Sequence, residues 1–260
     1  MTQMAGQTRR PEGGGESARD LVAAEGRRIE LRGLYNLRDL GGYPTASGSL
    51  PWRTLLRSDA LHQLDPAGIA WLRDLRLRTV VDLRTHVEAE IAPTPIDQLA
   101  GRHAHISILG GDLESLPLEL DAIYTFVTEQ RGDAIADAIR PLCGADAFPA
   151  LVHCSAGKDR TGMVIAMILA VLGVPDDVIA ADYALSGRYL DPSRTAAIGQ
   201  LQAGTGLGEQ LTGELLSSPP TLILNVLAVA RAQHGSVESY LLAHGLAAAD
   251  LAALRAALSG

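Results

Sequence analysis

The sequence predicts an α/β fold in which helices flank a mainly parallel central sheet. Short apolar, often β-branched runs alternate along the chain with longer helical segments. This alternation is typical of a parallel sheet, because parallel strands need crossover connections and these are usually helices. Hydrophobic residues make up 47% of the 260 residues, which is enough apolar surface for a sizeable core.

The chain is expected to be a single domain over residues 25–260, preceded by a tail. Residues 1–24 contain the stretch TRRPEGGGESARD. Its glycine, proline and charged residues offer little apolar surface to bury, so we expect this segment to be disordered.

The elements follow from local patterns. Residues 27–45 alternate partly and then break at a glycine pair, which predicts a short strand and a turn. Residues 64–77 predict a helix with Asp65 as its N-cap and Pro66 at its first position. Further strands are expected at residues 78–85, 103–111 and 148–154, and further helices at 115–129, 133–142, about 160–173, 176–185, 221–235 and 236–246.

Composition excludes some classes of function. The formal net charge of −8 argues against nucleic acid as a partner, since phosphate backbones favour basic surfaces. No apolar run is long enough for a transmembrane segment, and the N-terminus lacks the apolar core of a signal peptide. The two cysteines, Cys143 and Cys154, fit a reducing compartment. We therefore expect a cytoplasmic protein, or one secreted without a classical signal peptide.

One short stretch carries the chemistry. HCSAGKDRTG spans residues 153–162, between a predicted strand and a predicted helix. Backbone N–H groups at such a helix start bind a tetrahedral oxyanion. Arg160 can hold two phosphate oxygens, and Gly157 lets the loop turn its amides inward. In this positive field we expect Cys154 to be a thiolate that attacks phosphorus.

Neighbouring residues complete the predicted site. Thr161 can donate a hydrogen bond to the Cys154 sulfur, and His153 can orient the loop. The alternative is a buried, inert cysteine with Arg160 in an ordinary salt bridge. The match of several residue types at fixed spacing favours a phosphate site. Its substrate-binding residues are predicted to be Ser155, Ala156, Gly157, Lys158 and Thr161.

The stretch HCSAGKDRTG resembles the signature of the cysteine-dependent phosphatases, Cys-x5-Arg followed by Thr. The stretches GLYNLRDLGGYPT, LLRSDAL, TVVDLR and GSVESYL occur around it in the order typical of the bacterial tyrosine/serine phosphatase family. The resemblance covers the chain from about Ile29 to its C-terminus. It implies a protein-tyrosine-phosphatase-like fold with a helical lid, which would correspond to residues 186–217.

The resemblance also implies the activity. A member of this family would hydrolyse phosphotyrosine, with phosphoserine, phosphothreonine and phosphoinositides as further substrates. It would use a phosphocysteine intermediate, release inorganic phosphate and need no cofactor. Lys158 matches the basic loop position that this family links to phosphoinositide activity; the alternative is a solvated lysine.

Protonation of the leaving group needs a carboxylic acid. The resemblance favours Asp159, whose alternative is a structural carboxylate paired with Arg38 or Arg57. Asp112 is the rival acid, because it follows the strand at 103–111 in a Gly-Gly turn. The alternative for Asp112 is a surface turn residue or a helix N-cap.

Other polar residues are assigned less directly. Asp82 and Arg84 are interpreted as a structural ion pair, although Asp82 stands at a strand end that faces the site. Cys143 is interpreted as structural, with redox pairing to Cys154 as the weaker alternative. His103 and His105 share one strand face, but no further ligand accompanies them, so no metal site is expected. Residues that could support the loop from behind are His153, Asp82, Asn36, Arg38 and Asp39.

A function of another class also fits the pattern. The chain could be a catalytically silent module that binds phosphate and shields phosphorylated partners. The intact Cys154, Arg160 and Thr161 argue against this, because a pure binder does not need the nucleophile.

Overall fold

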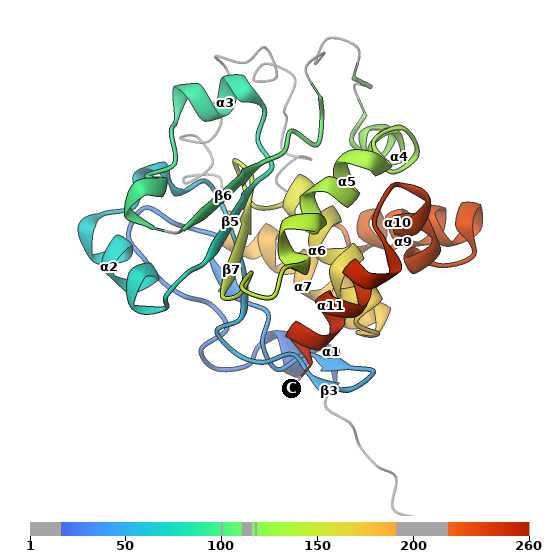
Figure 1. The fold of residues 1–260 in the computed structure, drawn as a ribbon, viewed down its shortest axis with the longest axis horizontal. Helices are drawn as coiled ribbons and strands as arrows, with labels where there is room; N and C mark the ends of the chain where they lie inside the picture. Colours follow the sequence, from blue (N-terminus) through green and yellow to red (C-terminus); the bar gives the residue numbers. More distant parts are fainter. Residues whose placement is uncertain (1–16, 100, 111–115, 118, 191–217, 260) are drawn as a thin grey trace, which may run out of the picture.

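The computed structural model describes residues 17–99, 101–110, 116–117, 119–190 and 218–259. Its centre is a five-stranded sheet (Figure 1). The order of its strands is β1 (Arg38–Asp39), β4 (Leu55–Ser58), β7 (Ala150–His153), β5 (Thr79–Asp82) and β6 (Arg102–His105). The strand β1 pairs antiparallel with β4, and the other pairings are parallel, as the alternating pattern predicts.

The central strand β7 and its neighbours β4 and β5 are buried along their whole length. Their side chains alternate between the faces of the sheet, as the strand geometry requires. Val81 and Val152 belong to the larger hydrophobic cluster, whereas Val80 and Leu151 belong to the smaller one. The sheet therefore joins two cores.

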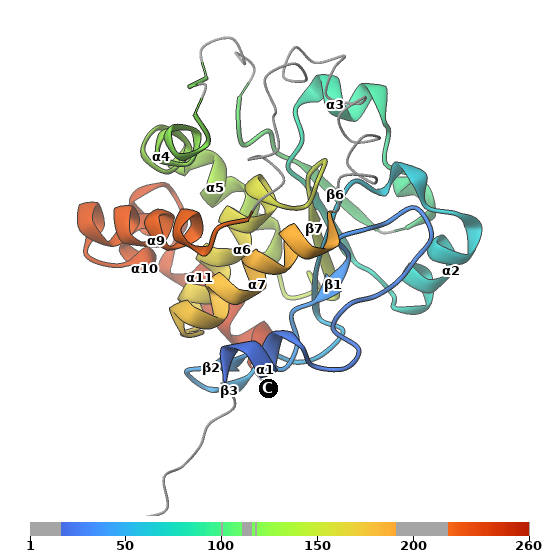
Figure 2. The ribbon, with the colours of Figure 1, turned by 180° about the vertical axis from the view of Figure 1, so that it is seen from behind.

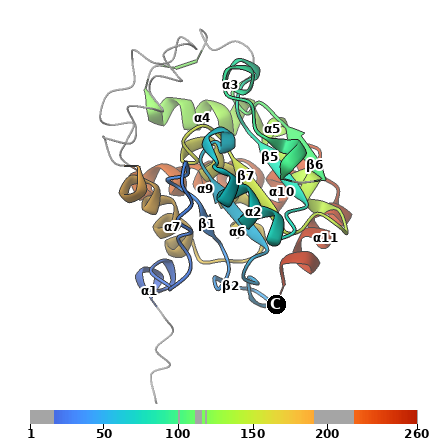
Figure 3. The same cartoon turned by 90° about the vertical axis from the view of Figure 1, so that its left-hand side faces the viewer.

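Helices cover both faces of the sheet, but one face carries many more helices than the other. The smaller cluster packs under α2 (Pro66–Asp74), seen in front of the sheet in Figure 3, with the 3-10 turns η1 (Leu61–Gln63) and η2 (Ile96–Gln98). The larger cluster lies among most of the other helices. These are α4 (Leu120–Gln130), α5 (Gly132–Ile139), the 3-10 turn η3 (Arg140–Cys143), α6 (Asp159–Val171), α7 (Asp176–Tyr189), α9 (Pro220–His234), α10 (Val237–Ala243) and α11 (Ala248–Leu258).

Local signals account for helix ends. The Asp65 carboxylate accepts from the N–H of Gly68 at 2.8 Å and Pro66 opens α2, so the predicted cap is confirmed. The helix α6 is followed by Gly173, whose φ of +80° is a conformation that favours glycine. The remaining elements are α1 (Ala18–Val22), the hairpin of β2 (Pro44–Thr45) and β3 (Gly48–Ser49), and α3 (His86–Ile91).

Some expectations differ from the structure. The expected tail overlaps α1, whose Leu21 and Val22 are buried in the larger cluster beside α7 (Figure 2). The helices α3 and α11 and the strand β4 were not predicted. Residues 186–189 of the expected lid belong to α7, and Leu190 is its C-cap residue; residues 191–217 lie outside the described residues, as does Asp112. No helix in the described part of the chain is both long and apolar enough to cross a membrane.

The parallel strands bring their carboxyl ends to one edge of the sheet. Ser58 of β4 and Asp82 of β5 both pair in register with His153 of β7. The loops that follow these strands therefore meet at that edge, which is where ligands bind in open α/β sheets.

Candidate active site

The loop of residues 154–160, called the 154–160 loop below, connects β7 to α6. Cys154 follows the strand directly and is only 2% exposed. Arg160 and Thr161 lie in the first turn of α6, so the positive end of this 13-residue helix is directed at the loop. Strand, loop and helix have the order that the sequence predicts.

Every carbonyl from residue 154 to residue 158 is held by a donor outside the loop. The ring Nδ1 of His153 lies 3.2 Å from the carbonyl oxygen of Cys154, and the N–H of Ala60 donates to that of Ser155 at 3.1 Å. The side-chain amide of Asn36 donates to the carbonyl of Ala156 at 2.9 Å.

One arginine holds the next two carbonyls. Arg57 of β4 donates through Nη2 to the carbonyl oxygens of Gly157 at 2.8 Å and Lys158 at 3.3 Å. In a planar trans peptide the following N–H points away from the carbonyl. The five contacts therefore turn the N–H groups of residues 155–159 toward the inner side of the loop, where they form an anion cradle.

Position 157 requires a glycine for two reasons, its backbone conformation and the lack of space for a side chain. Its φ is +66°, and a Cβ added there would lie 2.3 Å from the carbonyl oxygen of Ser58. The backbone of the 154–160 loop thus lies directly against the end of β4, and no side chain fits between them.

Arg160 is held by a carboxylate that sequence reasoning missed. Its Nη1 and Nη2 donate to Glu88 at 2.5 and 2.8 Å, and the Ser155 hydroxyl donates to the same carboxylate at 2.5 Å. Burial alone would raise the pKa of Glu88, but the charge of Arg160 and these hydrogen bonds lower it to about 2. Glu88 therefore stays ionised and aims the guanidinium at the loop.

A local signal for Glu88 was present in the sequence. Thr85 and Glu88 form a capping box at the start of α3, in which each side chain accepts from the other's backbone N–H. Thr-x-x-Glu after a buried strand is the sequence signature of this motif. The motif predicts the helix, but not that the same carboxylate reaches Arg160.

Asp159 lies at the start of α6, with its side chain 30% exposed. The hydroxyl of Tyr124 donates to its Oδ1 at 2.7 Å, and the Nζ of Lys158 lies 3.3 Å from the same oxygen. Arg38 and Arg57 pair with Asp182 instead, so the proposed alternative partners of Asp159 are excluded. Lys158 is 1% exposed and is not a solvated lysine.

Asp182 of α7 anchors the two buried arginines. It accepts from Arg38 at 2.9 Å and from Arg57 at 2.7 Å, and Tyr43 donates to it at 3.0 Å. Burial alone would raise the pKa of Asp182, but the two guanidinium charges lower it well below its usual range. Because Arg57 also holds the loop carbonyls, α7 supports the loop from behind.

Of the other residues that were predicted to support the loop from behind, Asn36 contacts the loop and Asp39 does not. Asn36 contacts the loop itself, and its Oδ1 accepts from Arg38 at 2.5 Å. Asp39 instead accepts from the N–H groups of Gly41 and Arg53, so it stabilises a turn away from the loop.

Asp82 and Arg84 form the predicted ion pair, at 2.6 Å. The Nε2 of His153 lies 3.6 Å from the Asp82 carboxylate, so this pair lies behind the residue that precedes Cys154. Burial, the largest cause, lowers the pKa of His153 to about 4. His153 is therefore neutral near pH 7 and acts through its backbone contact.

The hydroxyl of Thr161 is buried and has no hydrogen-bond partner among the described residues. It is available to a sulfur or oxygen anion at the loop. Cys143 lies in η3, before β7, whereas Cys154 follows that strand. Both cysteines are free in the structure. No group of three His, Cys, Asp or Glu side chains that could hold a metal ion occurs in the ranges that the structure describes.

Known proteins are similar in sequence to this chain over most of its length. The relative "Triple specificity protein phosphatase PtpB" of Mycobacterium tuberculosis is 29% identical over 277 residues, which cover 89% of this chain and 99% of the relative. A putative tyrosine-protein phosphatase of Cupriavidus necator is 30% identical over 229 residues, 80% of each chain. A solved putative phosphatase from Neisseria meningitidis covers 58% of this chain and 93% of its own, with 18% identity and a TM-score of 0.33, too low to bear on the fold.

A model of the tyrosine phosphatase family matches residues 29–260, and this range contains the 154–160 loop and all residues that hold it. The region of resemblance therefore coincides with the folded region that builds the site. The chain belongs to the tyrosine phosphatase family.

Proposed function

We propose that this chain is a cysteine-dependent phosphomonoesterase that hydrolyses phosphotyrosine through a phosphocysteine. The observation that carries the proposal is the 154–160 loop, whose five outward-held carbonyls leave the amides facing inward beside Cys154. An inward ring of N–H groups with an arginine fits the equatorial oxygens of a phosphoryl group in transfer.

The first step forms a sulfur–phosphorus bond. The Cys154 thiolate attacks phosphorus in line, the bond to the leaving oxygen breaks, and Asp159 gives that oxygen its proton. Arg160, oriented by Glu88, and the loop amides stabilise the charge on the equatorial oxygens.

The second step returns the enzyme to its starting state. A water molecule attacks phosphorus and the sulfur leaves as thiolate, while Asp159 accepts the proton of the water. The products are inorganic phosphate and free enzyme. The hydroxyl of Thr161, which has no partner among the described residues, is the donor that we assign to the departing sulfur.

The substrate range is proposed to include phosphoserine, phosphothreonine and phosphoinositides. The printed name of the mycobacterial relative, a triple specificity phosphatase, supports more than one substrate class. For phosphoinositides the assigned residue is Lys158. Lys158→Ala is expected to lower turnover of phosphatidylinositol phosphates relative to phosphotyrosine peptides. An unchanged ratio would exclude this role.

The central experiment measures p-nitrophenyl phosphate hydrolysis in the presence of a chelator. Wild type is expected to turn over and Cys154→Ser to be inactive. Vanadate binding by both proteins without turnover by either would instead support the silent phosphate-binding module.

The acid is tested separately. Asp159→Asn is expected to slow phenyl phosphate at least tenfold more than 2,4-dinitrophenyl phosphate, because dinitrophenolate leaves without a proton. Equal losses on the two substrates would exclude Asp159 as the acid and leave Asp112 as the candidate acid.

A further inference from the structure

Two tyrosine hydroxyls form a chain that ends on the proposed acid. Tyr124 of α4 lies 2.7 Å from the Oδ1 of Asp159, and the hydroxyl of Tyr183 of α7 lies 2.7 Å from that of Tyr124. The three helices α4, α6 and α7 thus meet at one carboxyl group. Neither tyrosine belongs to the catalytic steps above.

The direction of the chain follows from counting protons. A phenol has one proton to donate, and Oδ1 of the carboxylate can only accept it. Tyr124 therefore donates to Asp159, and Tyr183 donates to the oxygen of Tyr124. Burial, followed by the charge of Asp159, raises the pKa of Tyr124 well above its usual range, so this hydroxyl stays protonated at working pH.

Both contacts that Asp159 makes among the described residues reach the same oxygen. Tyr124 donates to Oδ1, and the ammonium group of Lys158 lies 3.3 Å from it. A proton on Oδ1 would compete with these two donors. The acid form of Asp159 is therefore favoured with its proton on Oδ2.

We propose that Tyr124 is a positioning residue that holds Asp159 through Oδ1 and reserves Oδ2 for the proton given to the leaving group, with Tyr183 orienting Tyr124. This inference rests on the proposed role of Asp159 as the acid. It adds that a carboxyl able to rotate freely would be a weaker acid catalyst, because catalysis requires the proton to be aligned with the leaving oxygen.

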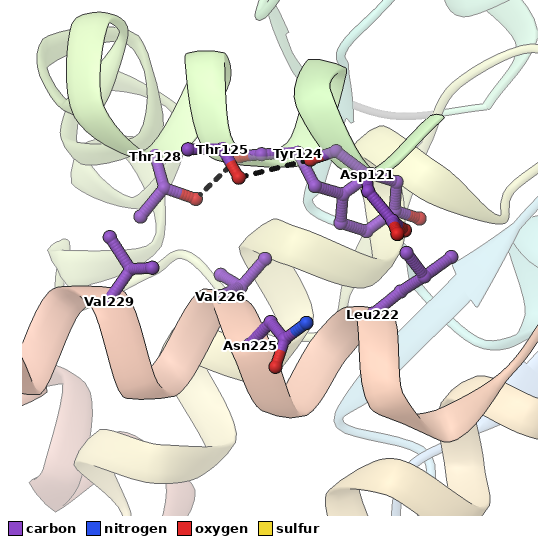
Figure 4. Close-up of a pocket in the computed structure, with 8 residues that line it drawn as sticks. All are labelled: Asp121, Tyr124, Thr125, Thr128, Leu222, Asn225, Val226 and Val229. Carbon is purple, nitrogen blue, oxygen red and sulfur yellow. Dashed lines mark hydrogen bonds between the residues drawn. The ribbon is translucent and has the colours of Figure 1, made fainter. Parts of the chain in front are cut away.

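Both phenol rings are buried in the larger hydrophobic cluster, which holds them in place. Tyr124, with Leu222 and Val226 of α9, lines a narrow cavity of about 40 Å³ between α4 and α9 (Figure 4). The ring of Tyr183 lies against Gly162 of α6, where a Cβ would approach it to 2.8 Å. Removing either hydroxyl should therefore leave its ring in place, so a phenylalanine variant tests the hydrogen bond alone.

The test compares Tyr124→Phe with wild type on two aryl phosphates. We expect kcat/KM to fall roughly tenfold for phenyl phosphate and less than about twofold for 2,4-dinitrophenyl phosphate. The ratio kcat/KM reports only the steps up to phosphoryl transfer to Cys154, so the hydrolysis of the phosphocysteine does not confuse the comparison. Tyr183→Phe should produce a smaller loss with the same selectivity.

Tyr240→Phe is the matched control. The buried hydroxyl of Tyr240 also donates at 2.7 Å to α4, but to the carbonyl of Thr128, away from Asp159. Its removal should loosen α4 without selecting between leaving groups. The same selective loss in this control, or an equal loss on both substrates in Tyr124→Phe, would overturn the proposal.

A double variant separates this inference from the proposed function. If Tyr124 acts through Asp159, adding Tyr124→Phe to Asp159→Asn should lower kcat/KM for phenyl phosphate no further. A selective loss in Asp159→Asn with none in Tyr124→Phe would reject only the positioning role. No selective loss in Asp159→Asn would reject the acid assignment itself, and the positioning role with it.

Discussion

At the scale of single residues, the site depends on side chains that each bind two different partners. Glu88 caps α3 and holds Arg160, and Arg57 pairs with Asp182 while donating to two loop carbonyls. Replacing such a residue changes local structure and chemistry together. Matched controls are therefore needed to distinguish the two effects.

Gly157→Ala is expected to destabilise the protein by about 3 kcal/mol and to abolish vanadate binding, because its Cβ would lie 2.3 Å from the Ser58 carbonyl oxygen. Gly26→Ala is the control, since Gly26 also has a positive φ, +80°, but no atom of the described part of the chain lies within 4 Å of the added Cβ. Its cost should be the backbone strain alone, about 1 kcal/mol. Urea unfolding and calorimetric titration measure both; equal costs would refute the steric argument.

Glu88→Gln tests the Arg160 contact through pH. The folded-state pKa of Glu88, about 2, lies below its ordinary value of 4.5, so its ionised form stabilises the fold. This contribution, about 3 kcal/mol, is complete above pH 4.5 and is lost as the pH falls toward 2. The stability difference between wild type and Glu88→Gln should therefore fall to about half between pH 6 and pH 3.

The control for this pH dependence is Glu238→Gln. Glu238 also pairs with an arginine, Arg255, but its side chain is 43% exposed. An exposed pair contributes about 1 kcal/mol or less. A pH-independent difference for Glu88→Gln, or an equally large effect of Glu238→Gln, would contradict the buried contact.

At the scale of elements, α7 connects the back of the loop to the proposed acid. Its consecutive residues Asp182 and Tyr183 reach different targets: the first pairs with the arginines of β1 and β4, and the second reaches Tyr124. In Figure 2, α7 crosses in front of α6 beside β1. The position of this one helix therefore bears on both the proposed phosphate loop and the proposed acid.

Asp182→Asn should lower the free energy of unfolding by about 3 kcal/mol, because two buried arginines lose their counter-charge. It should also weaken vanadate binding, since Arg57 would no longer be held at the loop carbonyls. Asp176→Asn, in the first turn of the same helix, removes an exposed pair with Arg231 and should cost under about 1 kcal/mol. Similar results for the two variants, measured by urea unfolding and titration, would contradict the anchoring role.

At the scale of the whole molecule, one sheet is shared by two hydrophobic clusters. The alternation of β5 and β7 places successive side chains in different clusters, so neither cluster can lose its packing alone. This supports the proposal that residues 25–260 unfold as a single domain.

Unfolding followed by far-ultraviolet circular dichroism and by tryptophan fluorescence should therefore coincide. Most helices lie on the larger cluster, whereas Trp71 packs against the smaller one; both probes are therefore measured in a Trp52→Phe background, in which Trp71 is the one tryptophan of the sequence. Leu151→Ala and Val152→Ala, on opposite faces of β7, should each shift both transitions together. Separate transitions for the two probes would contradict a single cooperative unit.

The sequence by itself determined the alternation of strands and helices, the cap of α2 and the Cys154-to-Arg160 spacing, because each depends on residues close together in the chain. It also contains two further local signals, the Thr85-x-x-Glu88 capping box and a charged Asp182 among the mostly apolar buried residues of α7. These signals indicate a helix and a buried charge, but they do not name the partners.

Only the tertiary structure decided those partners. Glu88 reaches Arg160 across 72 positions, Arg57 reaches Asp182 across 125, and Tyr124 reaches Asp159 across 35. Such contacts depend on the order of strands in the sheet and on which helix faces meet above it, and neither is set by local propensity or spacing. The residues of the loop and its place between a strand and a helix could therefore be predicted along the chain, whereas the groups that orient the loop were defined by packing.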